Sequence, residues 1–379
     1  MDFSLTKPEK LFLQMIREFA DKEVKPLAAE VDEQERFPVE TVEKMAKIGL
    51  MGIPVPKEYG GAGSTNQMYT MAVEELSRVC ATTGVIVSAH TSLCVAPIME
   101  HGTDAQKQKY LPKLASGEWL GAFGLTEPNA GTDASAQQTI AVADGDDYII
   151  NGTKIFITNA EYADVFIIFA MTDKSLGTKG ITAFILEKGM KGFSIGKKEL
   201  KMGIRGSATC ELIFEDVRVS KDQVLGKIGG GFGIAMKTLD GGRIGIASQA
   251  LGIAQGALDE TVKYTKERKQ FKRPLAQFQN TQFQLADMKT KIEAARLLVR
   301  SAAYKKDMKL PYSADAAMAK LFAAETSMEV TTKAVQLHGG YGYTREYPVE
   351  RMMRDAKITE IYEGTSEVQR MVISANLLK

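Results

Sequence analysis

The sequence predicts an α+β protein with an N-terminal helical domain (residues 1–120), a central antiparallel β-barrel (121–225) and a C-terminal four-helix bundle (226–379). Apolar residues recur every three or four positions in the first and last parts, which is the period of a helix. In the middle part, short runs of β-branched and aromatic residues follow one another closely, which is typical of strands. A chain of 379 residues is also long enough for two or three domains.

The first part is predicted to form helices with short breaks. Near-helical spacing relates two sets of residues, which are Leu11, Met15, Phe19 and Val24, and then Met71, Glu75, Val79 and Thr83. The stretch 54–63 is rich in proline and glycine, so we expect a loop there.

The middle part contains runs of strand-forming residues at 148–150, 155–158, 165–170, 181–186 and 211–214. Asn151 and Gly152 separate the first two runs, and both residue types tolerate a positive φ, so this dipeptide predicts a hairpin turn. Because no helical pattern lies between the runs, we expect an antiparallel sheet or barrel and not a doubly wound sheet.

The last part contains four apolar stripes with helical spacing, which predict an antiparallel bundle. They are formed by Ile244, Ala247, Leu251, Ala254, Leu258 and Val262; by Leu285, Met288, Ile292, Ala295 and Val299; by Ala317, Leu321, Ala324, Met328, Thr331 and Val335; and by Val368, Val372 and Ala375. The glycine-rich run 229–233 precedes them and predicts a flexible connector between barrel and bundle.

Composition and motifs exclude several classes of protein. The chain has 48 basic and 47 acidic residues, so its charge gives no argument for nucleic-acid binding. Three cysteines without CxxC and three histidines without HExxH disfavour a disulfide scaffold and a zinc enzyme. Because the sequence lacks GxGxxG and GxxxxGK[ST], neither a Rossmann site nor a P-loop is supported.

The same sequence gives an expectation for the compartment. No apolar run approaches the roughly 20 residues that span a bilayer, and the first ten residues lack the pattern of a signal peptide. We therefore expect a reducing, cytoplasmic compartment and no membrane partner.

Glu363 is the most informative candidate for chemistry. Ser366 and Gln369 have capping-box spacing before an apolar stripe, which places Glu363 in the turn before a helix. One interpretation is a surface charge that complements the helix dipole. The other is a general base, flanked by apolar Ile361 and Tyr362, whose pKa is raised by desolvation.

Other segments also have two interpretations. Glycines in the first bundle helix each cost about 1 kcal/mol relative to alanine, so either a neighbouring helix or a ligand packs on that face. Arg268 and Phe271 belong either to a solvated helix end or to a phosphate and ring site. The glycines of 339–342 predict a helix C-terminus, and they would also allow a ligand to approach closely. The glycines of the first bundle helix are Gly242, Gly245, Gly252 and Gly256.

Taken in order, five segments resemble the acyl-CoA dehydrogenase family: GLTEPNAGTD (124–133), IFITNA (155–160), ERKQF (267–271), QLHGGYGYTREYPVERMMRDAK (336–357) and IYEGTSEVQR (361–370). The resemblance covers essentially the whole chain. Residues 240–259 most resemble the short-chain, butyryl-CoA branch. The fold of that family agrees with the three-part organisation predicted from periodicity.

The resemblance implies FAD as cofactor and Glu363 as catalytic base. Some members, including isovaleryl-CoA dehydrogenases, carry the base on the first bundle helix, but Gly242 occupies that position here. Thr126 and Thr158 match residues that hydrogen-bond the flavin ring, and many relatives have tryptophan in place of Phe156. The full set implied for FAD is Phe123, Leu125, Thr126, Phe156, Ile157, Thr158, Arg268, Phe271, Gln279, Gln336, Leu337, Gly339, Gly340, Thr365 and Glu367.

The implied reaction is α,β-dehydrogenation of a short acyl-CoA, with electrons passing to an electron-transferring flavoprotein. Because part of the FAD site comes from a neighbouring subunit in the family, the resemblance also implies a homotetramer made of two dimers. Branched-chain specificity, an oxidase, and a non-catalytic protein that binds DNA remain alternatives. The positions that match acyl-CoA contacts are Thr132, Asp240, Arg243 and Gly364.

Overall fold

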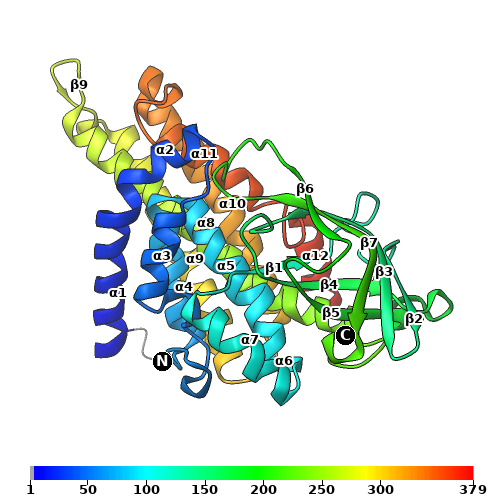
Figure 1. Ribbon diagram of the computed structural model, residues 1–379. Coiled ribbons are helices and arrows are strands. Elements are labelled where there is room, and N and C mark those ends of the chain that lie inside the picture. Colours follow the sequence, from blue (N-terminus) through cyan, green and yellow to red (C-terminus); the bar gives the residue numbers. More distant parts are fainter. Residues whose placement is uncertain (1–3, 379) are drawn as a thin grey trace.

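The computed structural model describes residues 4–378, which fold in the order helices, sheet, helices (Figure 1). This order confirms the predicted fold class. The sheet lies at one end of the molecule, and the long C-terminal helices extend away from it.

The N-terminal part consists of helices packed around a buried α4. They are α1 (Lys7–Phe19), α2 (Ala28–Glu33), α3 (Val39–Lys47), α4 (Asn66–Val79), α5 (Ala81–Ser88), α6 (Ala96–His101) and α7 (Asp104–Ser116), with π-helical turns at Ala20–Val24 and Ala89–Val95. Thr6 and Glu9 form a capping box that starts α1. Ile16, Met45 and Leu76 belong to the core that joins α1, α3 and α4.

One apolar segment is longer than the sequence analysis expected. Ala81–His101 is helical through 21 residues, with a mean hydropathy of 1.4 in its most apolar window. By length and composition it is able to cross a membrane, so the expectation that no such run exists is wrong. In the folded protein, 94% of that window is buried, which is how the core helix of a globular domain lies.

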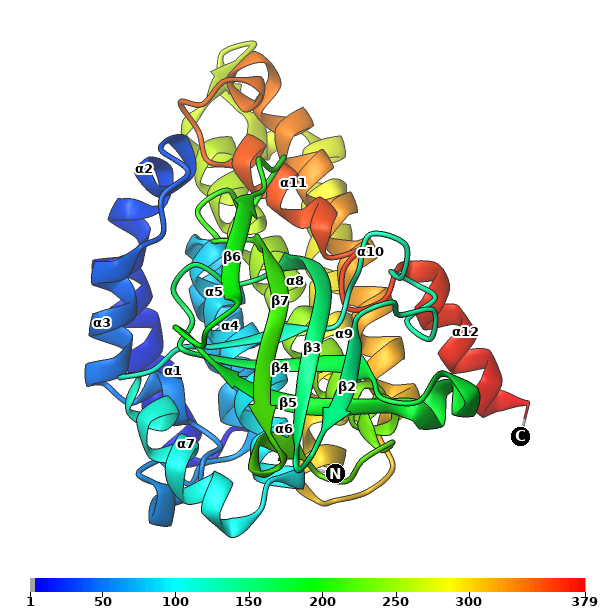
Figure 2. The same ribbon diagram turned by 45° about the vertical axis from the view of Figure 1, so that its right-hand side comes forward.

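Along the chain the strands come between the two helical parts, and in the sheet neighbouring strands follow the order β6-β7-β3-β2-β4-β5-β8. Figure 2 shows β3 and β7 crossing β4 and β5. The apolar side chains of Ile150, Phe166 and Leu212 fill the space between these two layers. The strands are β1 (Gly121–Gly124), β2 (Ile140–Asp144), β3 (Asp147–Ile157), β4 (Val165–Met171), β5 (Ile181–Glu187), β6 (Phe193–Lys198), β7 (Cys210–Ser220) and β8 (Val224–Leu225).

The prediction of a purely antiparallel sheet needs a correction. Both β1 and β2 pair with β4 in the parallel direction, while the other pairs of this sheet are antiparallel. A parallel pair needs a long connection, and the β2–β3 hairpin supplies it between β1 and β4.

The hairpin predicted at Asn151 and Gly152 is wrong, because β3 runs unbroken through both residues and its register with β7 shifts just before Gly152. A Cβ atom on Gly152 would lie 2.5 Å from Oγ1 of Thr139, so this glycine permits a bulge where two strands approach closely. The true turn is Gly145–Asp146 between β2 and β3. A Gly-Asp pair is itself a hairpin signal, which the sequence analysis missed.

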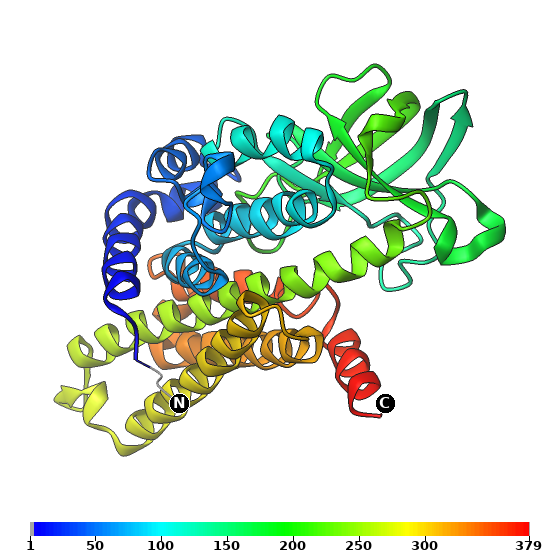
Figure 3. The same cartoon turned by 90° about the horizontal axis from the view of Figure 1, so that it is seen from below.

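The C-terminal part is built on three long helices, and Figure 3 shows α8 running between the N-terminal helices and the α9–α10 pair. Its elements are α8 (Gly231–Glu267), the small hairpin β9 (Lys269–Gln270) and β10 (Arg273–Pro274), α9 (Gln279–Asp307), α10 (Ser313–His338), α11 (Val349–Ile358) and α12 (Ser366–Leu377). The fourth predicted stripe is α12. The helix α11, which packs on α8 and α10, was not predicted.

The glycine run before α8 does more than connect. A Cβ atom on Gly231 would lie 2.6 Å from the backbone nitrogen of Ala183 in β5. The run therefore lets the first turn of α8 lie directly against the sheet.

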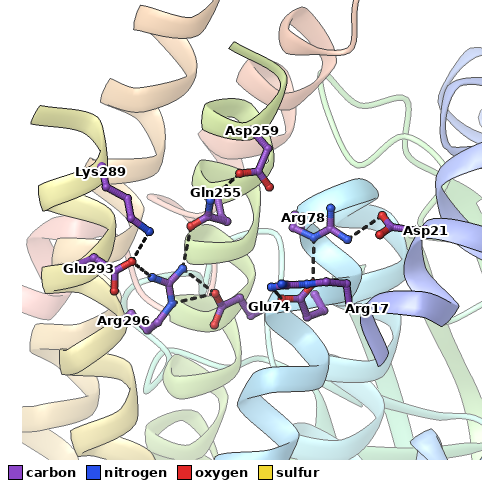
Figure 4. Close-up of polar contacts among 10 residues, drawn as sticks. Arg17, Asp21, Glu74, Arg78, Gln255, Asp259, Lys289, Glu293 and Arg296 are labelled. Carbon is purple, nitrogen blue, oxygen red and sulfur yellow. Dashed lines mark hydrogen bonds and ion pairs between the residues drawn. The ribbon is translucent and has the colours of Figure 1, made fainter. Parts of the chain in front are cut away.

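Adjacent acids on α4 tie the N-terminal helices to the bundle (Figure 4). Glu75 accepts hydrogen bonds from Arg17 of α1 (2.6 and 3.1 Å) and from Arg78 (2.9 Å). Glu74 accepts two from Arg296 of α9 (2.8 and 3.0 Å). Charged partners offset the cost of burying these two carboxylates, and their ion pairs fix α4 from both sides.

Candidate active site

Glu363 lies in a tight turn between α11 and α12. Its φ is +53° and that of Gly364 is +93°, so the backbone is left-handed at two successive residues, which is strained for a glutamate. The predicted helix start is confirmed, but the capping residue is Thr365 and not Ser366. The Thr365 hydroxyl accepts a hydrogen bond from the N–H of Val368 (3.3 Å). Glu363 therefore stands two residues before the N-cap of α12.

The Glu363 carboxylate points at the glycine-rich face of α8. A Cβ atom on Gly242 would collide with Oε2 of Glu363, and it would lie 2.9 Å from its Cδ and 2.8 Å from Cδ2 of Leu93. Within residues 4–378, Oε2 has no hydrogen-bond partner. A buried, unpartnered carboxylate oxygen is free to accept a proton from a ligand.

The other three α8 glycines that were considered as possible ligand contacts face protein instead, as the neighbouring-helix interpretation expected. A Cβ atom on Gly245 would lie 2.5 Å from the hydroxyl of Tyr69, and one on Gly252 would lie 2.8 Å from Cβ of Ser77. The one on Gly256 would collide with a backbone carbonyl of α4. These glycines allow α4 and α5 to pack closely on α8.

Burial decides the proton affinity of Glu363. Desolvation raises its pKa to about 8, and the positive charges of Lys320 and Arg243 oppose that rise. A carboxylate with such a pKa binds a proton more firmly than an exposed glutamate does. The structure therefore favours the general-base interpretation over the surface-charge interpretation.

A cavity of about 290 Å³ separates Glu363 from the sheet. Helices α5, α8 and α12 line one side of it, and the loops that follow β1 and β3 line the other. The site residues from the sequence analysis that line this cavity are Phe123, Leu125, Thr126, Thr132, Phe156, Ile157, Thr158, Arg243, Glu363 and Gly364. Thr365 and Glu367 follow Gly364 at the start of α12.

The sheet side of the cavity presents a flat apolar surface with hydroxyl groups beside it. Phe156 has a positive φ (+59°) at a bulge of β3, and its ring is 59% exposed. Thr126 and Thr158 line the same cavity. A large aromatic ring left exposed here, next to hydrogen-bonding groups, fits a planar ring system such as isoalloxazine.

A buried lysine holds the loop that carries Thr126. The Lys154 ammonium donates hydrogen bonds to the Leu125 carbonyl (3.2 Å), to Glu127 (2.7 Å) and to Gln137 (3.0 Å). Desolvation lowers its pKa to about 8. These bonds fix the backbone at the sheet edge of the cavity.

Several cavity residues were missed by sequence analysis. Val85, Ala89 and Leu93 line the helical side from α5 and the π-helical turn, and they recur every fourth residue. On α8 the same cavity is lined by Phe232, Met236 and Leu239, one turn apart. Helical spacing was the available signal, but it does not distinguish a ligand-facing stripe from a core stripe. The missed set is completed by Gly131, Asp133, Ala134, Ser135, Tyr362 and Val368.

Arg243, one of the positions that match acyl-CoA contacts, is buried and forms an ion pair. Its guanidinium donates to Asp240 (2.6 Å), which also accepts from Ser313 (2.9 Å). Its Nε atom has no partner among the described residues. Asp240 does not line the cavity beside Glu363; together with Lys237 of α8 it lines a second cavity, of about 880 Å³.

The remaining predicted cofactor residues lie at the far end of the molecule. A groove of about 530 Å³ is lined by Arg268, Gln336, Leu337, Gly339 and Gly340. Figures 1 and 3 show the β9–β10 hairpin at the end of α8 that is remote from the sheet. Within one chain, these residues are therefore not brought together with Glu363. Phe271, which is 88% exposed, and Gln279, at the start of α9, do not line this groove.

Comparison with known proteins places these features in one family. The models for the acyl-CoA dehydrogenase N-terminal, middle and C-terminal domains match residues 6–118, 122–217 and 229–378. A protein of Clostridium acetobutylicum described as "Acyl-CoA dehydrogenase, short-chain specific" is 66% identical over 379 residues and the full length of both chains.

Two solved structures superpose on the whole chain with a TM-score of 0.99, and both alignments cover 100% of each chain. One is butyryl-CoA dehydrogenase from Megasphaera elsdenii, at 54% identity. The other is a chain from a study of the electron transferring flavoprotein of Acidaminococcus fermentans, at 58% identity.

Proposed function

The chain belongs to the acyl-CoA dehydrogenase family, and from that premise we propose that it oxidises short-chain acyl-CoA, such as butyryl-CoA, to the 2-enoyl-CoA. One observation supports this most directly. Glu363 lines the cavity between the bundle and the sheet, and one oxygen of its buried carboxylate has no hydrogen-bond partner among the described residues. In this proposal Glu363 is the base that removes the α-proton.

The protein residues prepare this proton transfer. A C–H group next to a thioester is a weak acid, so its base needs a raised proton affinity and a site from which water is excluded. Burial provides both for Glu363, whose pKa is raised to about 8. Gly242 leaves the space that the carboxylate occupies, and the strained turn at Glu363 and Gly364 sets its direction.

The enzyme is FAD-dependent, as the flavoproteins of this family are. The chemistry that bound FAD supplies is acceptance of a hydride from the β-carbon. The exposed ring of Phe156 and the hydroxyl groups of Thr126 and Thr158 fit the flavin ring, with Phe123, Leu125 and Ile157 around them. Thr365 and Glu367 follow the turn formed by Glu363 and Gly364, and they complete this half of the site.

The other half of the FAD site comes, in this proposal, from a second copy of the chain. Arg268, Gln336, Leu337, Gly339 and Gly340 line the remote groove, while Phe271 and Gln279 lie next to it on the surface. These residues are too far from Glu363 to serve the same flavin within one chain. We therefore propose a homotetramer built from two dimers, in which each FAD is shared between subunits.

The acyl-CoA is proposed to lie along α8. Arg243, Asp240, Thr132 and Gly364 contact it, and the apolar side chains of the α5 and α8 stripes surround the acyl part. The Tyr362 hydroxyl hydrogen-bonds Gln249, which donates to the Ala81 carbonyl (3.0 Å), so the wall behind Glu363 is rigid. A fixed wall beside a small cavity favours a short acyl chain.

Electrons then pass to an electron-transferring flavoprotein, in keeping with the related chain from the Acidaminococcus study. We propose a cytoplasmic location, because Cys80, Cys94 and Cys210 are all free and buried, which suits a reducing compartment.

An anaerobic titration tests the function. Purified protein with bound FAD is mixed with straight and branched acyl-CoAs of four to eight carbons, and the flavin absorbance is followed. We expect rapid bleaching with butyryl-CoA and slower bleaching with longer or branched chains. Bleaching fastest with a branched substrate would instead assign a branched-chain enzyme. Absence of any bleaching, together with salt-sensitive binding of DNA, would assign a non-catalytic protein on this scaffold.

A further inference from the structure

Lys320 is a fully buried lysine with no carboxylate partner at salt-bridge distance in the described part of the chain. It lies in the first third of α10, and its exposed fraction is 0%. Burying an ammonium group is expensive unless nearby groups compensate for its lost hydration. Such a residue calls for an explanation.

Among the described residues, this ammonium makes one hydrogen bond. It goes to the turn formed by Glu363 and Gly364, which we call the base turn. Its Nζ donates to the Gly364 carbonyl at 2.8 Å. Gln369 of α12 donates to the same carbonyl (2.7 Å) and to the Glu363 carbonyl (3.2 Å). Three hydrogen bonds therefore hold a two-residue turn whose left-handed backbone is strained, and one of them is charged.

Two cations lie near this turn, Lys320 and Arg243. Among the described residues, Lys320 is the one without an ion-pair partner within salt-bridge distance. Lys320 faces Glu363 from the base turn, Arg243 from α8, Glu360 from the turn after α11 and Glu367 from α12. Glu363 faces Lys320 and Arg243. The charge of Glu363 also acts on the nearby hydroxyl groups of Tyr69 and Tyr362. Because Arg243 is already paired with Asp240 at 2.6 Å, its charge is largely cancelled.

Packing alone does not account for this lysine. Its ammonium lies beside the N-terminus of α12, where the helix dipole disfavours a positive charge. Desolvation also lowers the pKa of Lys320, which means that the site resists the charged form. Both effects oppose a lysine here, so a role in supporting the anionic side chain of Glu363 is the better explanation.

We propose that Lys320 is a positioning residue for Glu363: its ammonium holds the Gly364 carbonyl, and thereby the base turn, and its charge favours the ionised form of the Glu363 carboxylate, which is the form that accepts the proton. The inference rests on the proposed role of Glu363 as base. The α-proton moves from substrate to Glu363, and no proton has to pass through Lys320.

Removing the charge should move the pH dependence of the reaction in a defined direction. A nearby cation stabilises the carboxylate form, so its loss raises the pKa of Glu363 and extends the protonated, inactive form to higher pH. A rise of about one unit lowers the ionised fraction at pH 7 about tenfold.

The experiment follows flavin reduction by butyryl-CoA under anaerobic conditions from pH 6 to 10, using the purified protein with bound FAD. The variants are Lys320→Met, Lys320→Gln, which keeps a donor for the Gly364 carbonyl, and Lys320→Arg, which keeps the charge. Lys333→Met is the matched control, because Lys333 lies on the same helix and pairs with Glu329 at the surface (2.7 Å). Saturating rates and apparent dissociation constants are measured separately.

We expect the acid limb of the saturating rate to move up by about one pH unit in Lys320→Met and Lys320→Gln. It should stay within a few tenths of a unit of the wild-type limb in Lys320→Arg and Lys333→Met, with ligand affinity changed little in any variant. If the acid limb of the saturating rate stays at the wild-type pH in either neutral variant, the proposal is overturned. So would loss of FAD and of helical circular dichroism in both neutral variants, since that marks a purely structural lysine.

Other results would show that the proposed function itself, and not the role of Lys320, is wrong. If wild-type protein is not bleached by any acyl-CoA, or if Glu363→Gln is bleached at the wild-type rate, the proposed function fails whatever Lys320 does.

Discussion

Substituting Gly242 by alanine tests the geometry at the centre of the site. The new Cβ atom would lie 2.9 Å from Cδ of Glu363, whereas ordinary contacts begin at 3.4 Å, so the carboxyl carbon has to retreat by at least 0.5 Å and the nearer oxygen farther. A misplacement of about 1 Å in a reacting group costs roughly 100-fold in rate. We expect the saturating rate of flavin reduction by butyryl-CoA to fall about 10- to 100-fold, or roughly 1.4 to 2.7 kcal/mol.

Gly241→Ala is the matched control. Of the three atoms nearest to the Cβ added there, one lies closer than 3.4 Å: Nζ of Lys306, at 2.9 Å, which is the far end of a flexible side chain. In this variant we expect a near-wild-type rate and a stability gain of up to about 1 kcal/mol from the better helix former. Both rates are measured by stopped-flow absorbance after FAD content is equalised. If Gly242→Ala were reduced within threefold of the Gly241→Ala rate, the carboxylate would not occupy the place described here.

Four further predictions follow from the same geometry. Glu363→Gln should retain FAD and bind acyl-CoA, but lose flavin reduction by roughly 1,000-fold or more, measured anaerobically; a loss below tenfold would remove Glu363 as base. Because the pKa of Glu363 is raised from 4.5 to about 8, the native state holds its proton more tightly than the unfolded state, so the stability contribution of this residue is complete below pH 4.5 and is lost as the pH rises towards 8. Glu363→Gln should therefore raise the melting temperature more at pH 8.5 than at pH 5.5, and an equal shift at both would contradict the raised pKa. Gly256→Ala places a Cβ atom 2.9 Å from the carbonyl carbon of Arg78 and should destabilise the protein by about 1 to 3 kcal/mol in denaturant titration, unlike Gly241→Ala. Arg268→Ala should weaken FAD binding at least tenfold, with recovery in excess FAD, whereas retention of FAD after dialysis would separate the remote groove from the cofactor.

Local patterns were sufficient for much of the fold. Helical spacing on either side of a β-rich middle identified the three-part order, and the sequence around Glu363 indicated a turn before a helix. Asn151 and Gly152 misled, because a dipeptide that suits a turn also suits a bulge, and only the partner strand decides between them. Ser366 misled similarly, since Thr365 was an equally good cap one residue earlier.

Local sequence patterns could not predict the long-range contacts in the site. Gly242 and Glu363 are 121 positions apart, and nothing near either residue reports that the carboxylate fills the missing side chain of the glycine. Lys320 looked like one residue of a bundle helix, and its hydrogen bond to the Gly364 carbonyl depends on how α10 and α12 pack. The resemblance to the family supplied the role of Glu363, but it did not identify the residues that support it.

The apolar segment Ala81–His101 has a consequence for biosynthesis. One side of it packs on α8, whose last residue, Glu267, follows His101 by 166 positions (267 − 101). At about 5 to 20 residues per second, the ribosome needs roughly 8 to 33 seconds to supply that cover. During this interval the nascent chain exposes an apolar segment that could be recognised as a membrane anchor or could aggregate with other chains. We expect newly made chains to depend on a holding chaperone until the bundle emerges.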